Sequence, residues 1–237
     1  MKKVLIVETN VTRYQGTKEP TGLWLGESAE FVDELNKAGI AYDFVSPKGG
    51  FIPLDPRSMK YTDESILSVY EDPDFVYRGL TNTLKPAEVN ANDYFAIYYT
   101  GGHGVMWDFP DNQELQTIAK EIYTNNGYLV SVCHGIAGLL NIKDDNGNYI
   151  IANKAITGFT TAEEIIAGKK SVVPFLNKEI AEKNGATFKK KRFYKDYDIK
   201  DGRIITGQNP FSVRSVAKLL LNQVDLGGND HANNLGK

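Results

Sequence analysis

The sequence predicts an α/β fold in which a buried, mostly parallel sheet carries helices on both faces. Two observations support this prediction. Short apolar runs, typical of strands that are buried on both sides, alternate along the chain with longer stretches of helical pattern. The length of 237 residues suits one domain of this type with insertions, and it allows a sizeable core.

The expected elements follow the chain in order. Six runs are apolar on both sides and are therefore expected to be strands of a buried parallel sheet: residues 3–7, 42–45, 94–99, 128–132, 155–158 and 203–206. Six stretches have helical patterns: residues 23–38, 112–125, 136–141, 161–167, 173–184 and 212–224. Their alternation predicts βα units, which place helices on both faces of the sheet.

Two segments interrupt this alternation. Residues 47–92 contain several prolines, aromatic residues and charges, and we expect a cap of short helices beside the site. Residues 188–201 are basic and then aromatic, which favours a hairpin that reaches the turn dipeptide Asp201-Gly202.

The composition limits the organisation, partners and location of the protein. We expect one domain over residues 1–224 and a loose, polar tail over residues 225–237. A net charge of −3 and a pI near 5.7 argue against a nucleic-acid partner. The single cysteine excludes an internal disulfide and fits a reducing compartment. The first apolar run ends at Glu8, too early for a signal peptide, and no stretch could span a bilayer, so we expect a cytoplasmic protein without a membrane partner.

Cys133 is the first candidate for chemistry. It directly follows the predicted strand 128–132, and His134, Gly135 and a helix-competent stretch come after it. A strand that turns sharply into a helix can expose one side chain beside the N–H groups of the helix start. The field of that helix end favours a thiolate, which is the nucleophilic form of cysteine. The alternative is a buried, inert cysteine that packs like a small apolar residue.

Glu27 is an acid on the apolar face of the first predicted helix. Successive i, i+4 positions place four residues on one stripe: Leu23, Glu27, Phe31 and Leu35. Glu30 and Glu34 lie at other angles and are expected to be solvated. Because burial of an unpaired charge costs several kcal/mol, Glu27 is either paired and structural or held for proton transfer. Burial would raise its pKa toward the neutral range, where acid–base catalysis is efficient.

The glycine-rich turn Gly101-Gly102-His103-Gly104 follows the predicted strand 94–99. Its amides could stabilise an oxyanion, and the glycines are equally consistent with simple turn chemistry. His103 is either a loop histidine satisfied by backbone groups or a polar group of the pocket.

Cofactor-binding patterns are not found in the sequence. There is no G-x-x-x-x-G-K-[ST] loop, and no G-x-G-x-x-G opens the first helix. No His/Cys pair has zinc-finger spacing, and no H-E-x-x-H occurs. We therefore expect neither a nucleotide cofactor nor a native metal ion.

Four motifs in this order and spacing resemble the ThiJ/PfpI superfamily: Thr21-Gly22-Leu23-Trp24-Leu25-Gly26-Glu27, Gly101-Gly102-His103-Gly104, Ser131-Val132-Cys133-His134-Gly135 and Ile156-Thr157-Gly158-Phe159-Thr160. Three further segments resemble the heat-shock chaperone and glyoxalase III branch of this superfamily: Asn90-Ala91-Asn92-Asp93-Tyr94, Asp108-Phe109-Pro110 and Thr206-Gly207-Gln208-Asn209-Pro210. The resemblance extends from about residue 3 to residue 224. The family commonly has proline where this chain has Ile136, which we expect to affect the helix start and not the chemistry.

The resemblance implies a flavodoxin-like three-layer sandwich, a homodimer, and a cofactor-free conversion of methylglyoxal to lactate. Cys133 would be the nucleophile at a strained elbow, and Glu27 would contact its thiol and shuttle protons. His134 would complete a Cys-His-acid triad, oriented by Glu164 or by its neighbour Glu163.

The glycine-rich turn would supply the oxyanion and substrate-binding groups in this scheme. The backbone amides of Gly102 and His134 would hold the oxyanion, with Gly101 and His103 beside them. The small-molecule aldehyde would add to the sulfur as a hemithioacetal, pass through an enediol-like state and leave after hydrolysis of a thioester.

The same residues leave other functions open. An amide- or peptide-cleaving enzyme would use the same triad, although the cap is expected to narrow the pocket against protein substrates. Repair of glycated amines would also need these groups. A holding chaperone would need exposed apolar surface, for which residues 69–80 and 193–197 are candidates that could equally pack inside the cap or at a dimer contact. A redox sensor would rest with Cys133 as a sulfinic acid.

Overall fold

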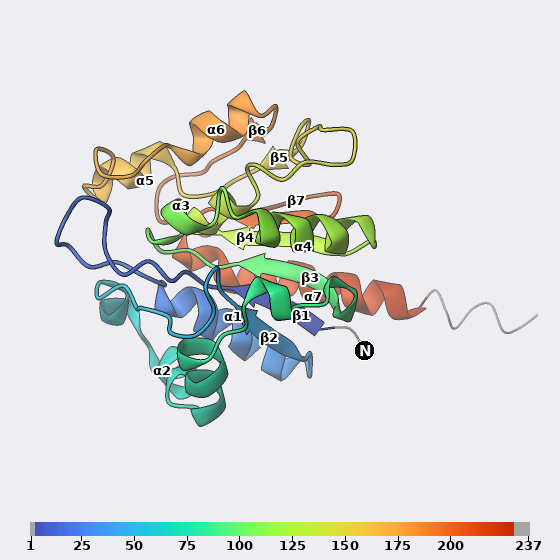
Figure 1. Ribbon diagram of the computed structural model, residues 1–237, viewed down its shortest axis with the longest axis horizontal. Helices are drawn as coiled ribbons and strands as arrows, with labels where there is room; N and C mark the ends of the chain where they lie inside the picture. Colours follow the sequence, from blue (N-terminus) through green and yellow to red (C-terminus); the bar gives the residue numbers. More distant parts are fainter. Residues whose placement is uncertain (1–2, 230–237) are drawn as a thin grey trace, which may run out of the picture.

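Six strands form one sheet in the computed structural model, which describes residues 3–229 (Figure 1). The order across the sheet is β2-β1-β3-β4-β8-β7, and every neighbouring pair is parallel except β7 with β8. The strands are β1 (Lys3–Val7), β2 (Tyr42–Val45), β3 (Tyr94–Tyr99), β4 (Tyr128–Val132), β7 (Asp198–Asp201) and β8 (Ile204–Gly207). Val7 pairs with Tyr99 and Tyr99 with Ser131, so the carboxyl ends of β1, β3 and β4 lie at one edge.

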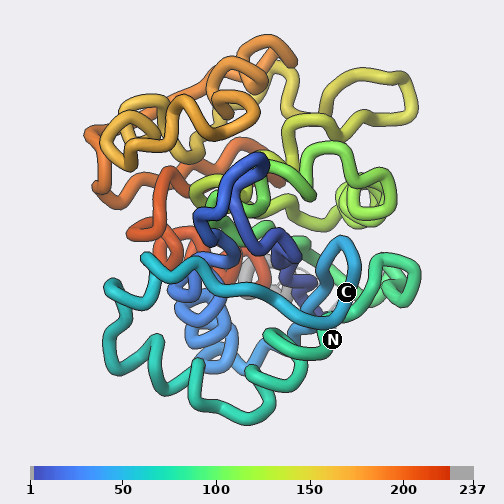
Figure 2. Tube along the Cα trace, turned by 60° about the vertical axis from the view of Figure 1, so that its left-hand side comes forward, coloured from blue at the N-terminus to red at the C-terminus, as the bar shows by residue number. Residues whose placement is uncertain are grey.

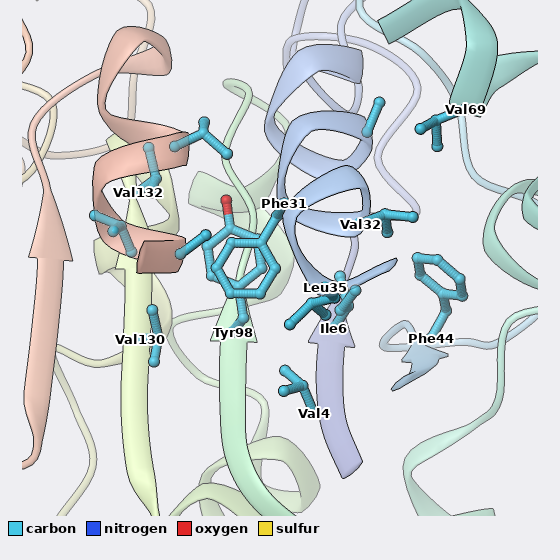
Figure 3. Packing of buried hydrophobic residues seen from close by; sticks show 14 of the residues in the cluster. Val4, Ile6, Phe31, Val32, Leu35, Phe44, Val69, Tyr98, Val130 and Val132 are labelled. Atoms are coloured by element: carbon cyan, nitrogen blue, oxygen red, sulfur yellow. The ribbon is translucent and has the colours of Figure 1, made fainter. Parts of the chain in front are cut away.

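Helices cover both faces of this sheet, which confirms the predicted sandwich. Alternate residues of β1 point to opposite faces: Ile6 belongs to one apolar cluster and Leu5 to the other. On the first face lie α1 (Leu25–Lys37) and α7 (Val213–Asn229), and Phe31 stacks on Tyr98 with ring centroids 3.7 Å apart (Figure 3).

The second face is covered by α4 (Gln113–Thr124), which packs on β3 and β4. Short helices contribute to the same apolar cluster: α3 (Val105–Asp108) through Val105 and α6 (Asn177–Lys183) through Ala181. Within the described residues, no helix combines the length and the apolar character needed to cross a membrane.

Residues 47–92 form a series of short helices that packs against α1 and β2. They comprise a 3-10 turn (Ser58–Tyr61), α2 (Glu64–Tyr70), a π-helical turn (Phe75–Thr81) and two further 3-10 turns (Pro86–Glu88 and Ala91–Asp93). Figure 2 shows the first loop, in dark blue, running between this teal segment and the orange segment that contains α5 (Thr161–Ile166) and α6. In segment 69–80, Val69, Phe75 and Leu80 are buried in the core and Tyr70 packs against it, so the segment packs inside the cap; Tyr77 is its exposed aromatic residue.

Several predicted elements differ in extent or partner. The run 155–158 contributes only β5 (Ala155–Ile156), which pairs with β6 (Thr187–Phe188) outside the main sheet. The helix expected over 136–141 is a 3-10 helix over Cys133–Gly138. The hairpin is formed by β7 and β8 on either side of Gly202, at φ +61°, and not within 188–201. The backbone of α7 continues to Asn229, so residues 225–229 of the predicted tail are helical, and residues 230–237 lie outside the described part.

The expectation that Glu30 and Glu34 are solvated is wrong. Arg214 of α7 lies over this side of α1 and contacts Glu34 at 2.7 Å and Asp33 at 2.6 Å. Glu34 is buried and Glu30 is partly buried, with a pKa raised to about 7 because burial outweighs the attraction of Arg214. The helical pattern places both acids away from the sheet, but it contains no information about a second helix packing there.

Candidate active site

Cys133 occupies a strained elbow between β4 and the following 3-10 helix. Its φ is +59°, a left-handed value that costs energy for a residue with a side chain and that clusters at functional sites. The turn is tight because Gly135 packs on β3: a Cβ there would lie 2.2 Å from the carbonyl oxygen of Tyr99. The chain is thus forced to present the Cys133 side chain at the carboxyl edge of the sheet.

Glu27 lies on the buried face of α1, as its stripe predicts, and is completely inaccessible to solvent. Its Oε2 accepts a hydrogen bond of 2.7 Å from the backbone N–H of Gly101. Its Oε1 has no hydrogen-bond partner among the described residues. Burial raises the pKa of Glu27 to about 8, and the Cys133 thiol and the Gly101 amide partly oppose that shift. The carboxyl is therefore mostly protonated at neutral pH and can reach both protonation states.

Burial favours the thiol form of Cys133, whereas the helix start alone favours the thiolate. Its side chain is only 3% exposed, and burial followed by the neighbouring Glu27 raises the pKa of the thiol well above its ordinary value. The backbone N–H of His134 lowers that pKa, as expected for a helix start, but its effect is smaller. The contact between the two side chains raises the pKa of the Cys133 thiol and lowers the pKa of the Glu27 carboxyl, although it is not a well-aligned hydrogen bond.

His134 and Glu164 form the acid–histidine part of the predicted triad. Nε2 of His134 lies 2.8 Å from Oε2 of Glu164, and Nδ1 lies 3.5 Å from the sulfur of Cys133. Burial would raise the pKa of Glu164, but the charges and hydrogen bonds of His134 and His103 outweigh it and hold that pKa well below the ordinary value. An ionised carboxylate can only accept, so Nε2 of His134 carries a proton, and Nδ1 is the ring nitrogen that faces the sulfur of Cys133.

Glu163, the alternative acid, faces away from His134. It closes the capping box of α5, with Oε2 accepting from the backbone N–H and the hydroxyl of Thr160. Its Oε1 accepts from Gln208 and Asn209 and from the backbone N–H of Tyr194. The structure thus places Glu164 beside the histidine and gives Glu163 a structural position.

His103 is a buried member of this cluster. Its Nε2 lies 2.7 Å from Oε1 of Glu164, and its Nδ1 lies 2.9 Å from Nη2 of Arg57. Because both ring nitrogens are occupied, the side chain is not free to bind an oxyanion. Arg57 was not among the candidates from sequence, because it lies in the cap and no local pattern indicates that it contacts a residue 46 positions later.

The glycine-rich turn follows β3 beside Cys133 and Glu27. A Cβ at Gly101 would lie 2.6 Å from Oε2 of Glu27 and 3.0 Å from Cβ of Cys133. The Gly101 amide donates to Glu27 and is therefore not free to hold an oxyanion, a role that the resemblance assigns to the amides of Gly102 and His134. Gly102 has φ +106°, and a Cβ there would lie 2.2 Å from the carbonyl oxygen of Gly22, so only glycine fits.

A cavity of about 770 Å³ adjoins these groups. Cys133, His134, His103 and Gly102 belong to its lining. Aromatic side chains from five segments form much of its wall: Trp24, Tyr61, Phe159, Tyr194 and Phe211. Besides Tyr61, four residues of the cap line it, namely Arg57, Lys60, Asp63 and Ile66. The cap therefore borders the site, and the cavity has ample room for a small aldehyde beside the sulfur.

One set of side chains has the composition of a metal site. Possible ligand atoms of His103, His134 and Glu164 lie within 4.8 Å of one another. Both histidine Nε2 atoms already hydrogen bond to the two carboxylate oxygens, and this pairing accounts for the geometry. We therefore do not assign a metal centre to this set, and the absence of a native metal stays a prediction.

Comparison with known proteins adds independent information about ancestry. The model of the DJ-1/PfpI family matches residues 25–223. The chain is 36% identical over 231 residues to a protein named glutathione-independent glyoxalase HSP31 of Saccharomyces cerevisiae, covering 91% of this chain and 95% of that protein.

Two crystal structures are similar along almost the whole chain. That of Rapid Encystment Protein 24 kDa of Francisella tularensis has a TM-score of 0.90 at 37% identity, with 94% of this chain and 99% of that chain covered. That of glyoxalase III from Candida albicans has a TM-score of 0.83 at 30% identity, covering 93% and 96%. With the elbow cysteine, the buried acid and the predicted sandwich in place, the chain belongs to the DJ-1/PfpI family.

Proposed function

We propose that this protein is a glutathione-independent glyoxalase that converts methylglyoxal to lactate without a cofactor. The observation that carries the proposal is that Cys133, on the wall of the cavity, contacts two proton-transfer groups: Glu27, which is buried behind it, and the Nδ1 atom of His134. Relatives with the printed names glutathione-independent glyoxalase and glyoxalase 3 support it.

The first step adds the thiol to the aldehyde carbon of methylglyoxal. Nδ1 of His134 takes the thiol proton as the sulfur attacks, and Glu164 stabilises the imidazolium that forms. The aldehyde oxygen takes the proton of Glu27, whose pKa of about 8 keeps the carboxyl protonated at rest. The products are a hemithioacetal on Cys133, an imidazolium and a Glu27 carboxylate, so the total charge is unchanged.

The second step moves hydrogen between the two neighbouring carbons. The Glu27 carboxylate takes the proton from the carbon bound to sulfur, and the adjacent ketone oxygen takes a proton from His134, which gives an enediol. Glu27 then returns its proton to the second carbon while the hydroxyl on the first carbon gives its proton to His134. The result is a lactoyl thioester on Cys133, and one carboxyl has served both as base and as acid.

The third step hydrolyses the thioester. Glu27 takes a proton from water as the oxygen of that water attacks the thioester carbon. The backbone amides of Gly102 and His134 are proposed to hold the oxyanion that forms. The sulfur leaves with the proton of His134, and the site returns to a thiol, a protonated Glu27 and a neutral imidazole.

A direct test is a proton NMR time course of purified protein with methylglyoxal and no glutathione. The proposal predicts that the methyl doublet of lactate appears in proportion to enzyme concentration. Small aminopeptidase substrates, incubated in parallel, test the amidase alternative. Lactate formation without amide cleavage is expected, and amide cleavage without lactate would replace the proposal with the alternative.

The homodimer and the cytoplasmic location expected from the sequence stay predictions. Light scattering after size-exclusion chromatography of the purified protein measures its mass in solution. A mass of about twice the 26.4 kDa of one chain is the result expected for the dimer.

A further inference from the structure

Arg57 makes contacts on both sides of its guanidinium. On one side it pairs with the fully buried Asp55, with Nε 3.0 Å from Oδ1 and Nη2 2.7 Å from Oδ2. On the other side Nη2 lies 2.9 Å from Nδ1 of His103 and 2.5 Å from the hydroxyl of Tyr14, so its two hydrogens are shared among these two atoms and Oδ2 of Asp55. Asp55 is itself fixed by the hydroxyl of Thr21 at 3.0 Å. The guanidinium is therefore held at a defined position beside His103.

The chemistry of guanidinium determines where the proton of His103 lies. Arginine donates and cannot accept, so Nδ1 of His103 must be the acceptor in this contact. The ring is neutral, because burial and the nearby His134 lower the pKa of His103 to about 4. A neutral ring carries one proton, which is then on Nε2 and is donated to Oε1 of Glu164.

Glu164 consequently accepts hydrogen bonds from two N–H donors, one on each carboxylate oxygen. Nε2–H of His103 holds Oε1, and Nε2–H of His134 holds Oε2. If His103 carried its proton on Nδ1 instead, the Nε2 lone pair would face a carboxylate oxygen at 2.7 Å. Glu164 would then have to rotate or take up a proton, and in either case its hydrogen bond with His134 would weaken.

We propose that Arg57 is a positioning residue for the proposed glyoxalase reaction, which it serves by locking His103 as the Nε2–H tautomer. The effect passes through Glu164 to His134, whose Nδ1 receives the thiol proton of Cys133. This inference rests on the proposed function only for its kinetic part. The tautomer is a property of the protein alone and can be measured without substrate.

The position of Arg57 on the cavity wall suggests a competing role in substrate binding. The two roles predict different kinetics. Loss of a group that only binds substrate raises KM and leaves kcat unchanged, whereas loss of a group that orients the acid–histidine pair lowers kcat.

The experiment compares Arg57→Met, Arg57→Lys and the control Lys85→Met. Lys85 lies in the same cap, is exposed, is not among the residues that line the cavity and makes no ion pair within the described residues, so its loss removes the same charge without touching His103. Long-range nitrogen–proton NMR of the histidine rings reports the tautomer. The chain has only three histidines, and His103→Gln assigns the relevant signal. Steady-state kinetics with methylglyoxal gives kcat and KM for each variant.

In the wild type we expect an unprotonated Nδ1 and a protonated Nε2 on His103. In Arg57→Met we expect a mixture of tautomers, a kcat lowered about tenfold or more, and a KM within about twofold of the wild-type value. Arg57→Lys should recover part of the Nε2–H tautomer population and part of kcat, because an ammonium group can still donate to Nδ1 of His103. Lys85→Met should match the wild type.

Removing Arg57 alone leaves the buried Asp55 carboxylate unpaired, which costs stability. The same measurements are therefore made on Asp55→Asn/Arg57→Met, where no charge is stranded. An unchanged tautomer with unchanged kcat in both variants would overturn the proposal, as would a raised KM with normal kcat. If the wild type forms no lactate, the proposed function fails, while the tautomer measurement still decides the role of Arg57.

Discussion

Oε2 of Glu27 accepts a 2.7 Å hydrogen bond from the backbone N–H of Gly101, and this contact fixes the carboxyl beside the sulfur of Cys133. The helix α1 and the turn after β3 thus hold one acid in place from two directions. A buried carboxyl with one fixed oxygen and one oxygen lacking a partner can exchange protons without reorienting. This relationship is the structural basis of the proposed proton shuttle.

The space next to Gly101 provides the first prediction. A methyl group there would lie 2.6 Å from Oε2 of Glu27 and 3.0 Å from Cβ of Cys133, between the two reacting groups. We expect Gly101→Ala to lower kcat/KM for methylglyoxal by about a hundredfold or more. Gly26→Ala is the matched control, because its added methyl group meets the flexible end of Ile66 at 3.3 Å and makes an ordinary contact of 4.0 Å with Trp24. Equal activity of the two variants would contradict this geometry.

The role of Glu27 in proton transfer can be separated from the general effect of a buried acid. We expect Glu27→Gln to lose nearly all lactate formation, because an amide cannot take up and return a proton. Glu8→Gln is the control, since Glu8 is also fully buried and burial raises its pKa to about 8 as well. Its Oε1 accepts from Ser28 at 2.6 Å, a bond that glutamine can keep, and it has no contact with Cys133. Initial rates measured by NMR should therefore fall for Glu27→Gln and stay near wild type for Glu8→Gln.

The raised pKa of Glu27 predicts a pH-dependent stability. Its pKa is about 8 in the folded chain against 4.5 in the unfolded chain, so the folded state binds the proton more tightly. The favourable contribution is complete below pH 4.5 and is lost as the pH rises from 4.5 through 8. Glutamine mimics the protonated carboxyl. The free energy of unfolding of Glu27→Gln, relative to that of the wild type, should therefore increase by a few kcal/mol between pH 5 and pH 9. Urea unfolding at both values measures this; a stability difference that does not change with pH would show that Glu27 titrates normally.

The two adjacent acids of α5 should give opposite phenotypes. Glu164→Gln replaces one acceptor with a donor that faces an N–H of His103 or His134, so we expect kcat to fall about a hundredfold or more with little change in melting temperature. Glu163→Gln disturbs the capping box and the contacts with Gln208 and Asn209, so we expect a lowered melting temperature. Differential scanning fluorimetry and methylglyoxal kinetics on both variants separate the roles. A reversed pattern would assign the triad acid to Glu163.

Much of the fold could be predicted from the sequence because strands buried on both faces leave a direct signal. The bounds of β1, β2, β3 and β4 agree with the apolar runs, and the stripe through Glu27 located the buried acid. Short or edge elements gave no such signal. The strand β7 is partly exposed and pairs only at one edge, and β5 has two residues whose partner lies far along the chain.

The protonation of the site could not be predicted from local sequence. The helix start after Cys133 favours a thiolate, but burial and Glu27 have the larger effect on its pKa, and both depend on tertiary packing. Arg57 shows the same limit, since its contact with His103 is made across the cap. Even the choice between Glu163 and Glu164 needed the direction in which α5 presents each side chain.

The most direct test is the rate of lactate formation from methylglyoxal by Cys133→Ala and the wild type, followed side by side by proton NMR. Alanine removes the sulfur and keeps the buried methylene position, so the fold should persist and circular dichroism should confirm it. The account predicts no lactate above the uncatalysed background for the variant and steady turnover for the wild type. Lactate formed at the wild-type rate by Cys133→Ala would show that the reaction does not pass through this sulfur.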